Sequence, residues 1–255
     1  MLSPLFQWLT TQIKVLNTER RSLDQETSKA CALDHEIKSR VLDLMASADL
    51  GVVDFELKEQ TLPDHERSKE VSESLRSFLN TIVKSSSTGT VDPQWAEGKM
   101  ETTVLYHKAP DGQQIPLKVH QESDGTVAYF GLLGPCLKAL RSGGLICIDE
   151  LNASLHSLLA IQLVHLFNKQ STNPGHAQLI FNSHDTNLLQ RSILRRDQIW
   201  FTEKDHEGAT HLYPLTDFKT RQHQDLERGY LQGRFGAVPF IDHNDFVALA
   251  TEVEG

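Results

Sequence analysis

Cysteine is scarce in this 255-residue sequence, which contains Cys31, Cys136 and Cys147 and no others. An odd number of widely spaced cysteines in apolar surroundings is typical of buried free thiols and argues against a disulfide framework. The sequence has no run of about 18 apolar residues, the length that a membrane-spanning helix needs. Its first 16 residues have neither the basic start nor the small-residue cleavage site of a signal peptide. We therefore expect a cytoplasmic protein with no membrane segment.

Positive charge is also in short supply, with 25 Lys and Arg residues against 34 Asp and Glu residues and a formal net charge of −9. A chain of this charge has no global basic field to attract nucleic acid or anionic lipid. A local basic groove is not excluded, so nucleic-acid binding stays open. No pair of cysteines or histidines has finger-like or ribbon-like spacing, which argues against a zinc site. The composition, 39% hydrophobic and 23% charged, is that of an ordinary globular protein.

The first 100 residues have a mainly helical pattern. Apolar residues recur at three- and four-residue steps in two stretches: Leu5, Leu9, Ile13 and Leu16, then Leu33, Ile37, Val41, Leu44 and Ala48. The polar run 17–29 between them predicts a solvated turn or a helix end. Alternating apolar residues in 53–57 predict a short strand, and 71–82 form another amphipathic pattern. The Ser-, Thr- and Gly-rich stretch 84–99 marks a candidate boundary, so we expect a helical region with a short strand over residues 1–100.

Residues 101–255 alternate between strand and helix patterns. Two strands flank the turn Ala109-Pro110-Asp111-Gly112, and a helix follows Thr126, with Pro135 expected to kink it. Apolar strands at 145–148 and 179–181 are each followed by a helix pattern, at 155–167 and 187–194. A hairpin at 199–203 and 210–214 follows. This order predicts an α/β fold with a mainly parallel sheet.

Two acids end the first apolar strand. Asp149 and Glu150 follow Leu145-Ile146-Cys147-Ile148, which is the Walker B pattern of nucleotide hydrolases. In such a site Asp149 would hold Mg²⁺ and Glu150 would polarise the attacking water. Many buried strands end in acids that only cap the next helix, so this cluster is weak by itself.

Two further clusters lie at strand–helix turns. His184 follows the second apolar strand, where a histidine can donate a hydrogen bond to a γ-phosphate. Ser123, Gly125 and Thr126 precede a helix, whose N-terminus offers a hydroxyl and backbone N–H groups to an anion. For each cluster the alternative is an ordinary helix cap.

The order of these clusters resembles that of the ABC-type ATPases of the SMC and RecF kind. By this resemblance Ser123, Gly125 and Thr126 form the signature turn, which contacts the γ-phosphate of the opposite subunit. Asp149 and Glu150 form the Walker B pair, and His184 is the switch histidine. The D-loop is then the segment with Asn152, Ser154 and His156. The expected fold is the C-terminal lobe of a P-loop NTPase, with ATP and Mg²⁺ as cofactors and a head-to-tail homodimer through the ATP sites.

The likeness extends to the RloA-like AAA-family ATP-binding proteins linked to abortive infection and phage defence. It rests on the acid cluster and on four other segments: Ser154-Leu155-His156, Ser183-His184-Asp185-Thr186-Asn187-Leu188-Leu189, Leu194-Arg195-Arg196-Asp197-Gln198-Ile199-Trp200-Phe201 and Gly229-Tyr230-Leu231-Gln232-Gly233-Arg234-Phe235-Gly236. The resemblance implies ATP hydrolysis in a phage-defence system, with a defence effector protein as a possible partner.

The phosphate-binding loop G-x-x-x-x-G-K-[ST] is absent from the sequence. The Gly98-Lys99 pair is followed by Met100, and Pro93 stands five positions before Gly98. Without this loop the phosphates lose their main anchor. We therefore expect the Walker A lobe to be supplied upstream or in trans, and little ATP affinity from this chain alone.

Two alternatives stay open. A degenerate or regulatory module would keep the fold and dimerise or bind a partner without hydrolysing ATP, and the absent loop favours it. A nuclease is the other, although no carboxylate cluster beyond the Walker B pair is evident. The acids of Asp242-His243-Asn244-Asp245 lie in a polar tail and are better explained as solvated.

Overall fold

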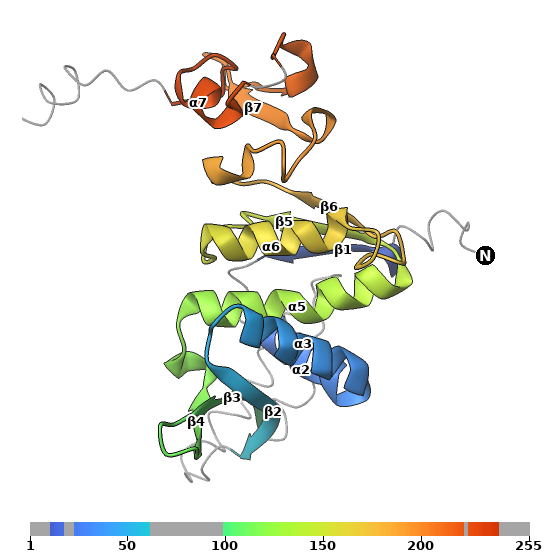
Figure 1. The fold of residues 1–255 in the computed structure, drawn as a ribbon, viewed down its shortest axis with the longest axis vertical. Coiled ribbons are helices and arrows are strands. Elements are labelled where there is room, and N and C mark those ends of the chain that lie inside the picture. The colour runs from blue at the N-terminus through green and yellow to red at the C-terminus, as the bar shows by residue number, and fades with distance from the viewer. Residues whose placement is uncertain (1–10, 18–22, 62–98, 222–223, 240–255) are drawn as a thin grey trace, which may run out of the picture. The chain divides into compact units, whose positions relative to one another are not determined.

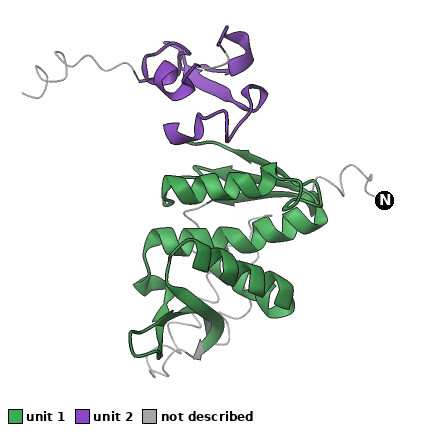
Figure 2. Ribbon diagram, viewed as in Figure 1, with its two compact units in different colours: residues 1–183 green, residues 184–255 purple. Residues whose placement is uncertain are grey.

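The structure, a computed structural model, describes residues 11–17, 23–61, 99–221 and 224–239. Contacts divide the chain into two compact units, residues 1–183 and 184–255 (Figure 2). The predicted helix at 71–82, residues 84–98 of the candidate boundary and the tail at 242–245 lie outside the described residues. The expected division near residue 100 thus stays a prediction. In the described part of the chain, no helix is long and apolar enough to cross a membrane.

A small parallel sheet in the first unit carries the apolar strands predicted from the sequence. Its strand order is β1 (Ile13–Asn17), β5 (Leu145–Asp149), β6 (Gln178–Phe181) (Figure 1). Ile13 pairs with Leu145, and Leu145 pairs with Gln178, both in parallel register. The α/β class with a parallel sheet is therefore confirmed. The helix expected across Ile13 and Leu16 is wrong, because these residues form β1 and Leu16 is buried in the sheet.

A second, antiparallel sheet joins β2 (Val52–Thr61), β3 (Lys99–Lys108) and β4 (Gln114–Lys118) in the same unit. It confirms the short strand predicted at 53–57 and the strand pair around the turn at 109–112. Phe55 on β2 packs edge-on against Phe130, with 4.8 Å between ring centroids. This contact fixes the antiparallel sheet to the helix that carries Phe130.

That helix is α5 (Asp124–Ser142), which continues through Pro135. Proline has no N–H to donate to the carbonyl of Gly131, four residues earlier. The Thr27 hydroxyl donates to that carbonyl instead, at 2.7 Å, and accepts from the Gly134 N–H at 3.2 Å. A Cβ on Gly134 would lie 2.5 Å from the same hydroxyl oxygen, so glycine permits the contact.

Thr27 belongs to α2 (Leu23–Leu33), which begins inside the run 17–29, where a solvated turn or a helix end was expected. The solvated turn is therefore wrong for residues 23–29. The face of α2 that packs against α5 and β3 includes the buried polar residues Asp24, Thr27 and Ser28. The Ser28 and Thr103 hydroxyls lie 3.1 Å apart and share a hydrogen bond. Because part of its buried face is polar, α2 lacks the regular spacing of apolar residues by which a helix is predicted from sequence.

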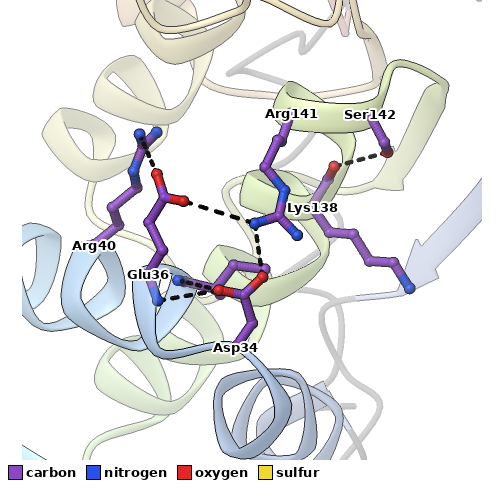
Figure 3. A network of polar contacts seen from close by, with 7 residues as sticks. Asp34, Glu36, Arg40, Lys138, Arg141 and Ser142 are labelled. Carbon is purple, nitrogen blue, oxygen red and sulfur yellow. Dashed lines mark hydrogen bonds and ion pairs between the residues drawn. The ribbon is translucent and has the colours of Figure 1, made fainter.

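Charged residues connect α3 (His35–Ser47) to the end of α5 (Figure 3). Asp34 caps α3 by accepting from the Glu36 and Ile37 N–H groups, at 3.0 and 3.2 Å. The Arg141 guanidinium lies 2.6 Å from Asp34 and, with those N–H groups, lowers the pKa of this carboxyl below its ordinary value. Glu36 extends the network to Arg40 on the next turn of α3, at 2.8 Å.

The second unit has its own core. The predicted hairpin is confirmed as β7 (Trp200–Lys204) and β8 (Thr210–Pro214), and α7 (Leu226–Leu231) lies beyond it. Phe201 stacks on Tyr230 and Phe235, with centroid distances of 5.6 and 5.7 Å. The helix expected at 187–194 is wrong: a 3₁₀ turn, Thr186–Leu188, is the helical element there.

Candidate functional site

The two acids lie at the carboxyl end of β5. Ile146 and Ile148 on this strand are buried, whereas Asp149 and Glu150 are exposed. Ligands of open parallel sheets bind at this end of the strands. The strand thus presents both carboxylates where the sequence predicted them.

Asn182 connects the two acids. It follows β6 directly, and because Ile148 pairs with Phe181, Asn182 lies beside Asp149. Its amide Nδ2 donates to Oδ1 of Asp149 at 2.7 Å, and its Oδ1 accepts from the Glu150 N–H at 2.5 Å. One amide therefore holds a carboxylate oxygen of the first acid and the backbone of the second.

The backbone of Glu150 is in the left-handed region, with φ of 51°. This conformation is unfavourable for a residue with a Cβ, by roughly 1 kcal/mol, and persists where surrounding contacts hold it. The bond from the Glu150 N–H to Asn182 and a turn from the Ala153 N–H to the Glu150 carbonyl, at 2.9 Å, are such contacts. The Glu150 side chain is therefore directed by a defined backbone conformation.

Sequence reasoning did not assign Asn182 a role. The prediction named His184 in the same run, although Asn182 is the first residue after the second apolar strand. The available signal was positional: neighbouring parallel strands end at the same edge, so the first polar residue after each one lies near the other.

The segment predicted as a D-loop follows the acids. Asn152 accepts a hydrogen bond from the Ser183 hydroxyl at 2.6 Å, which connects it to the residue after Asn182. His156 caps α6 (Ser157–Asn168), because its Nδ1 accepts from the Leu158 N–H at 3.2 Å. His156 thus has a structural contact of its own in addition to any binding role.

The turn before α5 lies against this segment. The Ser123 hydroxyl accepts from the Thr126 N–H at 3.1 Å and lies 2.9 Å from the Thr126 hydroxyl, so Ser123 is the N-cap of α5. A Cβ on Gly125 would stand 3.0 Å from the Ser154 carbonyl oxygen. The structure therefore brings together the predicted signature turn and the predicted D-loop of one chain.

A known protein family matches the part of the chain that carries these residues. Residues 19–190 match the family described as "AAA domain, putative AbiEii toxin, Type IV TA system". The chain belongs to this AAA-domain family. No curated protein matches the sequence.

The AAA-domain match extends from the residues before α2 to just after β6. It includes both acids, Asn182, the Ser123–Thr126 turn and His184. The small parallel sheet within an α/β arrangement is consistent with a P-loop AAA domain. Strand β1 and the β7–β8 hairpin lie outside the match.

His184 is the first residue of the second unit, and its side chain is exposed. His184 was predicted to lie near Asp149 and Glu150, which belong to the first unit. This prediction stays a prediction. Beside it, Asp185 caps the 3₁₀ turn by accepting from the Asn187 N–H at 3.0 Å. Arg195, in the same unit but beyond the matched residues, forms an ion pair with Asp197 at 2.9 Å.

The AAA domain's donor set fits magnesium in part. No group of three His, Cys, Asp or Glu side chains that could hold a metal is found among the residues that the structure describes. Mg²⁺ seldom needs such a group, since one or two carboxylates, water and substrate phosphates usually complete its octahedron. Asp149, an exposed carboxylate oriented by Asn182, suits this mode. The residues present thus fit a magnesium ion that arrives with a phosphate ligand.

Proposed function

We propose that this AAA domain supplies the Walker B half of an ATP-hydrolysing site. The observation that carries the proposal is the Asp149–Asn182–Glu150 arrangement at the carboxyl end of β5. Two carboxylates with separate environments are suited to separate roles. One, held by an amide, would bind a cation, and the other, on an exposed turn, would act on water.

Asp149 would hold Mg²⁺, directly or through water, and Glu150 would orient the attacking water and accept its proton. The bound ion would neutralise charge on the β- and γ-phosphates. Asn182 would keep the Asp149 carboxylate directed at the ion while setting the Glu150 backbone. His184 would donate to the γ-phosphate, and Asn152, Ser154 and His156 would line the nucleotide.

The signature turn would serve a second subunit. Ser123, Gly125 and Thr126 would contact the γ-phosphate held by the opposite copy in a head-to-tail homodimer. The Gly125–Ser154 contact supports this proposal, because it couples the turn to the D-loop of the same chain. The family description names a putative toxin of a type IV toxin–antitoxin system, which supports a toxin–antitoxin setting for this chain. A phage-defence role and an effector protein as partner are part of the same proposal.

A second candidate function is a non-catalytic module that dimerises or binds a partner. The absence of G-x-x-x-x-G-K-[ST] from the 255 residues favours it for the chain as it stands. The two candidates differ in whether Mg-ATP is turned over once a phosphate-binding loop is provided.

The deciding experiment is a titration with Mg-ATP that follows binding and phosphate release together. We expect little binding to the chain alone, and turnover when a phosphate-loop segment completes the site. In the completed site, Glu150→Gln should retain ATP binding and lower turnover at least about 100-fold, because general-base contributions are of that order. Glu207→Gln, in the exposed β7–β8 turn, is the matched control and should change nothing. Unchanged turnover in Glu150→Gln would refute the assignment.

A further inference from the structure

A buried carboxylate lies directly before the predicted signature turn. Glu122 precedes Ser123, the N-cap of α5, and its side chain is 7% exposed. Nε2 of His107 on β3 lies 2.5 Å from Oε1 of Glu122, and the histidine side chain is 22% exposed. A carboxylate that water hardly reaches needs a partner within the protein, because burying it unpaired is costly. His107 supplies this partner.

The antiparallel sheet fixes the position of His107. The residue pairs with Val52 of β2 and with Ile115 of β4, so a strand flanks it on each side. Alternate residues of a strand share a face, so His107 is on the same face of β3 as Leu105, which is fully buried. Its Nδ1 lies 3.4 Å from the position that a Cβ on Gly51 would take. The imidazole therefore extends from a strand that packs against the rest of the unit.

The pair closes the chain segment that leads from β4 to α5. After Lys118, the last residue of β4, the chain makes a 3₁₀ turn, Val119–Gln121, and reaches Glu122. The Glu122 N–H donates to the Val119 carbonyl at 3.2 Å. The contact with His107 connects the end of this segment to β3, 15 residues earlier in the sequence. Glu122 is thus held by its backbone and by its side chain.

The signature turn is held on two sides. On one side, the contact with His107 fixes Glu122, the residue before Ser123. On the other, Gly125 lies against the Ser154 carbonyl of the predicted D-loop. The first contact is made by side chains and the second by backbone. A change of the side chain at position 107 therefore releases one side of the turn and leaves the other in place.

We propose that His107 is a positioning residue, which acts through Glu122 to hold the Ser123–Thr126 turn in the conformation that contacts the γ-phosphate of the opposite copy. The imidazole Nε2–H donates to the carboxylate, and the carboxylate holds the start of the turn. This inference rests on the proposed function for what the turn contacts. The hold of His107 on the turn is a property of the single chain and can be measured without nucleotide.

Hydrogen–deuterium exchange of the 255-residue chain tests that hold. His107→Leu removes the donor and leaves the Glu122 carboxylate buried without its partner. We expect the amides of Thr126 and Val127, which donate to the Ser123 hydroxyl and carbonyl, to exchange at least about tenfold faster in this variant. Equal exchange of these two amides in the variant and the unmodified chain would overturn the proposal.

Two amides at the start of α6 separate a local release from a general loss of stability. Leu159 and Ala160 both donate to the His156 carbonyl, at 2.8 and 3.2 Å. Their exchange should be the same in His107→Leu as in the unmodified chain, because the release is confined to the turn before α5. Faster exchange of both pairs of amides by the same factor would mean that His107 only stabilises the fold, and would overturn the positioning role.

Three further variants complete the exchange experiment. His107→Gln keeps an N–H donor and should restore slow exchange in part. Glu122→Gln leaves no charge buried, so it stays folded even if His107→Leu does not, and its neutral hydrogen bond is weaker. It should speed exchange of the Thr126 and Val127 amides to a smaller extent. His211→Leu breaks an exposed imidazole–carboxylate pair with Asp205 and is the matched control, which should change neither amide.

Mixed dimers test whether the turn serves the opposite copy. In the completed site, dimers of His107→Leu alone should turn over Mg-ATP about 10–100-fold more slowly, the usual effect of a misplaced binding group. Dimers of Glu150→Gln alone lack the proposed base. A mixed dimer has one site with Glu150 from the first variant and an unmodified turn from the second. Mixing the two variants should therefore give more turnover than either alone, and no gain would overturn the proposal.

The positioning role and the proposed function fail in different ways. If the completed, unmodified protein does not turn over Mg-ATP while His107→Leu still releases the turn, His107 holds the turn and the proposed function is refuted. If the completed protein turns over Mg-ATP and His107→Leu does so equally fast, the proposed function is supported and the positioning role is refuted.

Discussion

The parallel sheet of the first unit and the hairpin of the second differ in how far their apolar side chains are buried. In the hairpin, Phe201 is 6% exposed and stacks between rings of its own unit. In the sheet, Val15 and Ile180 stay largely exposed although α5 and α6 cover the other face. The hairpin unit completes its core within its own residues, whereas the sheet buries one face and offers the other.

Breaking the closed core should have the largest effect. Phe201→Ala removes the ring that packs on Tyr213, Phe218, Tyr230 and Phe235. We expect the free energy of unfolding of the second unit to fall by about 3–5 kcal/mol, the usual loss for a buried phenylalanine. Urea denaturation followed by near-ultraviolet circular dichroism measures it. Leu212→Ala, at an exposed position of the same hairpin, should change stability by less than about 0.5 kcal/mol.

An intermediate loss of stability is expected from a change of Asn182, which holds the two acids at the end of β5. Asn182→Ala leaves the Glu150 N–H without its amide partner and frees the Asp149 carboxylate to turn. We expect a loss of about 1–2 kcal/mol in stability and, in the completed site, an affinity for Mn²⁺ with nucleotide that is about 10–100-fold weaker. Thermal denaturation and electron paramagnetic resonance of Mn²⁺ measure the two effects. If Asn182→Ala and Asn187→Ala have the same stability and the same Mn²⁺ affinity, the hydrogen bonds of Asn182 to Asp149 and Glu150 have no role.

The smallest change in stability is expected at Asp24, a buried carboxyl in the first unit. Asp24 on α2 is 4% exposed, and burial raises the pKa of its carboxyl, against the hydrogen bond from Thr103. A raised pKa means that the folded state prefers the protonated form. The stability it contributes is present below the unfolded pKa, near 3.9, and is lost as the pH rises through the folded pKa.

Asp24→Asn should therefore stabilise the protein at neutral pH, because the amide carries no charge that burial penalises. The difference from the unmodified chain should shrink as the pH falls toward the unfolded pKa. Melting temperatures measured from pH 4 to pH 7.5 test this, with Asp111→Asn in the exposed β3–β4 turn as the control. A stabilisation that is independent of pH would contradict the assignment.

The sequence predicts the parts of the fold that local patterns determine. The strands at 145–149 and 178–181 are short, mainly apolar runs on either side of α6, and both hairpins have turn residues at the right places. Strand β1 escaped prediction because its five residues also fit a helical spacing with Leu9. Its strand conformation depends on pairing with β5, far along the chain. Helix α2 escaped because its buried face is partly polar.

In the candidate site, too, some residues could be predicted from local sequence and others could not. Asp149 and Glu150 could be found from the strand that delivers them, and the position of Ser123 at a helix start could be read from the turn. The role of Asn182 depends on which residue of β6 stands beside Asp149, and that register follows from packing. The Gly125–Ser154 contact likewise brings together residues whose separation along the chain gives no signal.

The left-handed backbone of Glu150 has an evolutionary consequence. Glycine adopts this conformation without strain, so a change of Glu150 to glycine would relieve the backbone strain while removing the proposed base. Selection for stability and selection for hydrolysis therefore pull in opposite directions at this one codon. A lineage released from the need to turn over ATP should lose this side chain early and keep the fold.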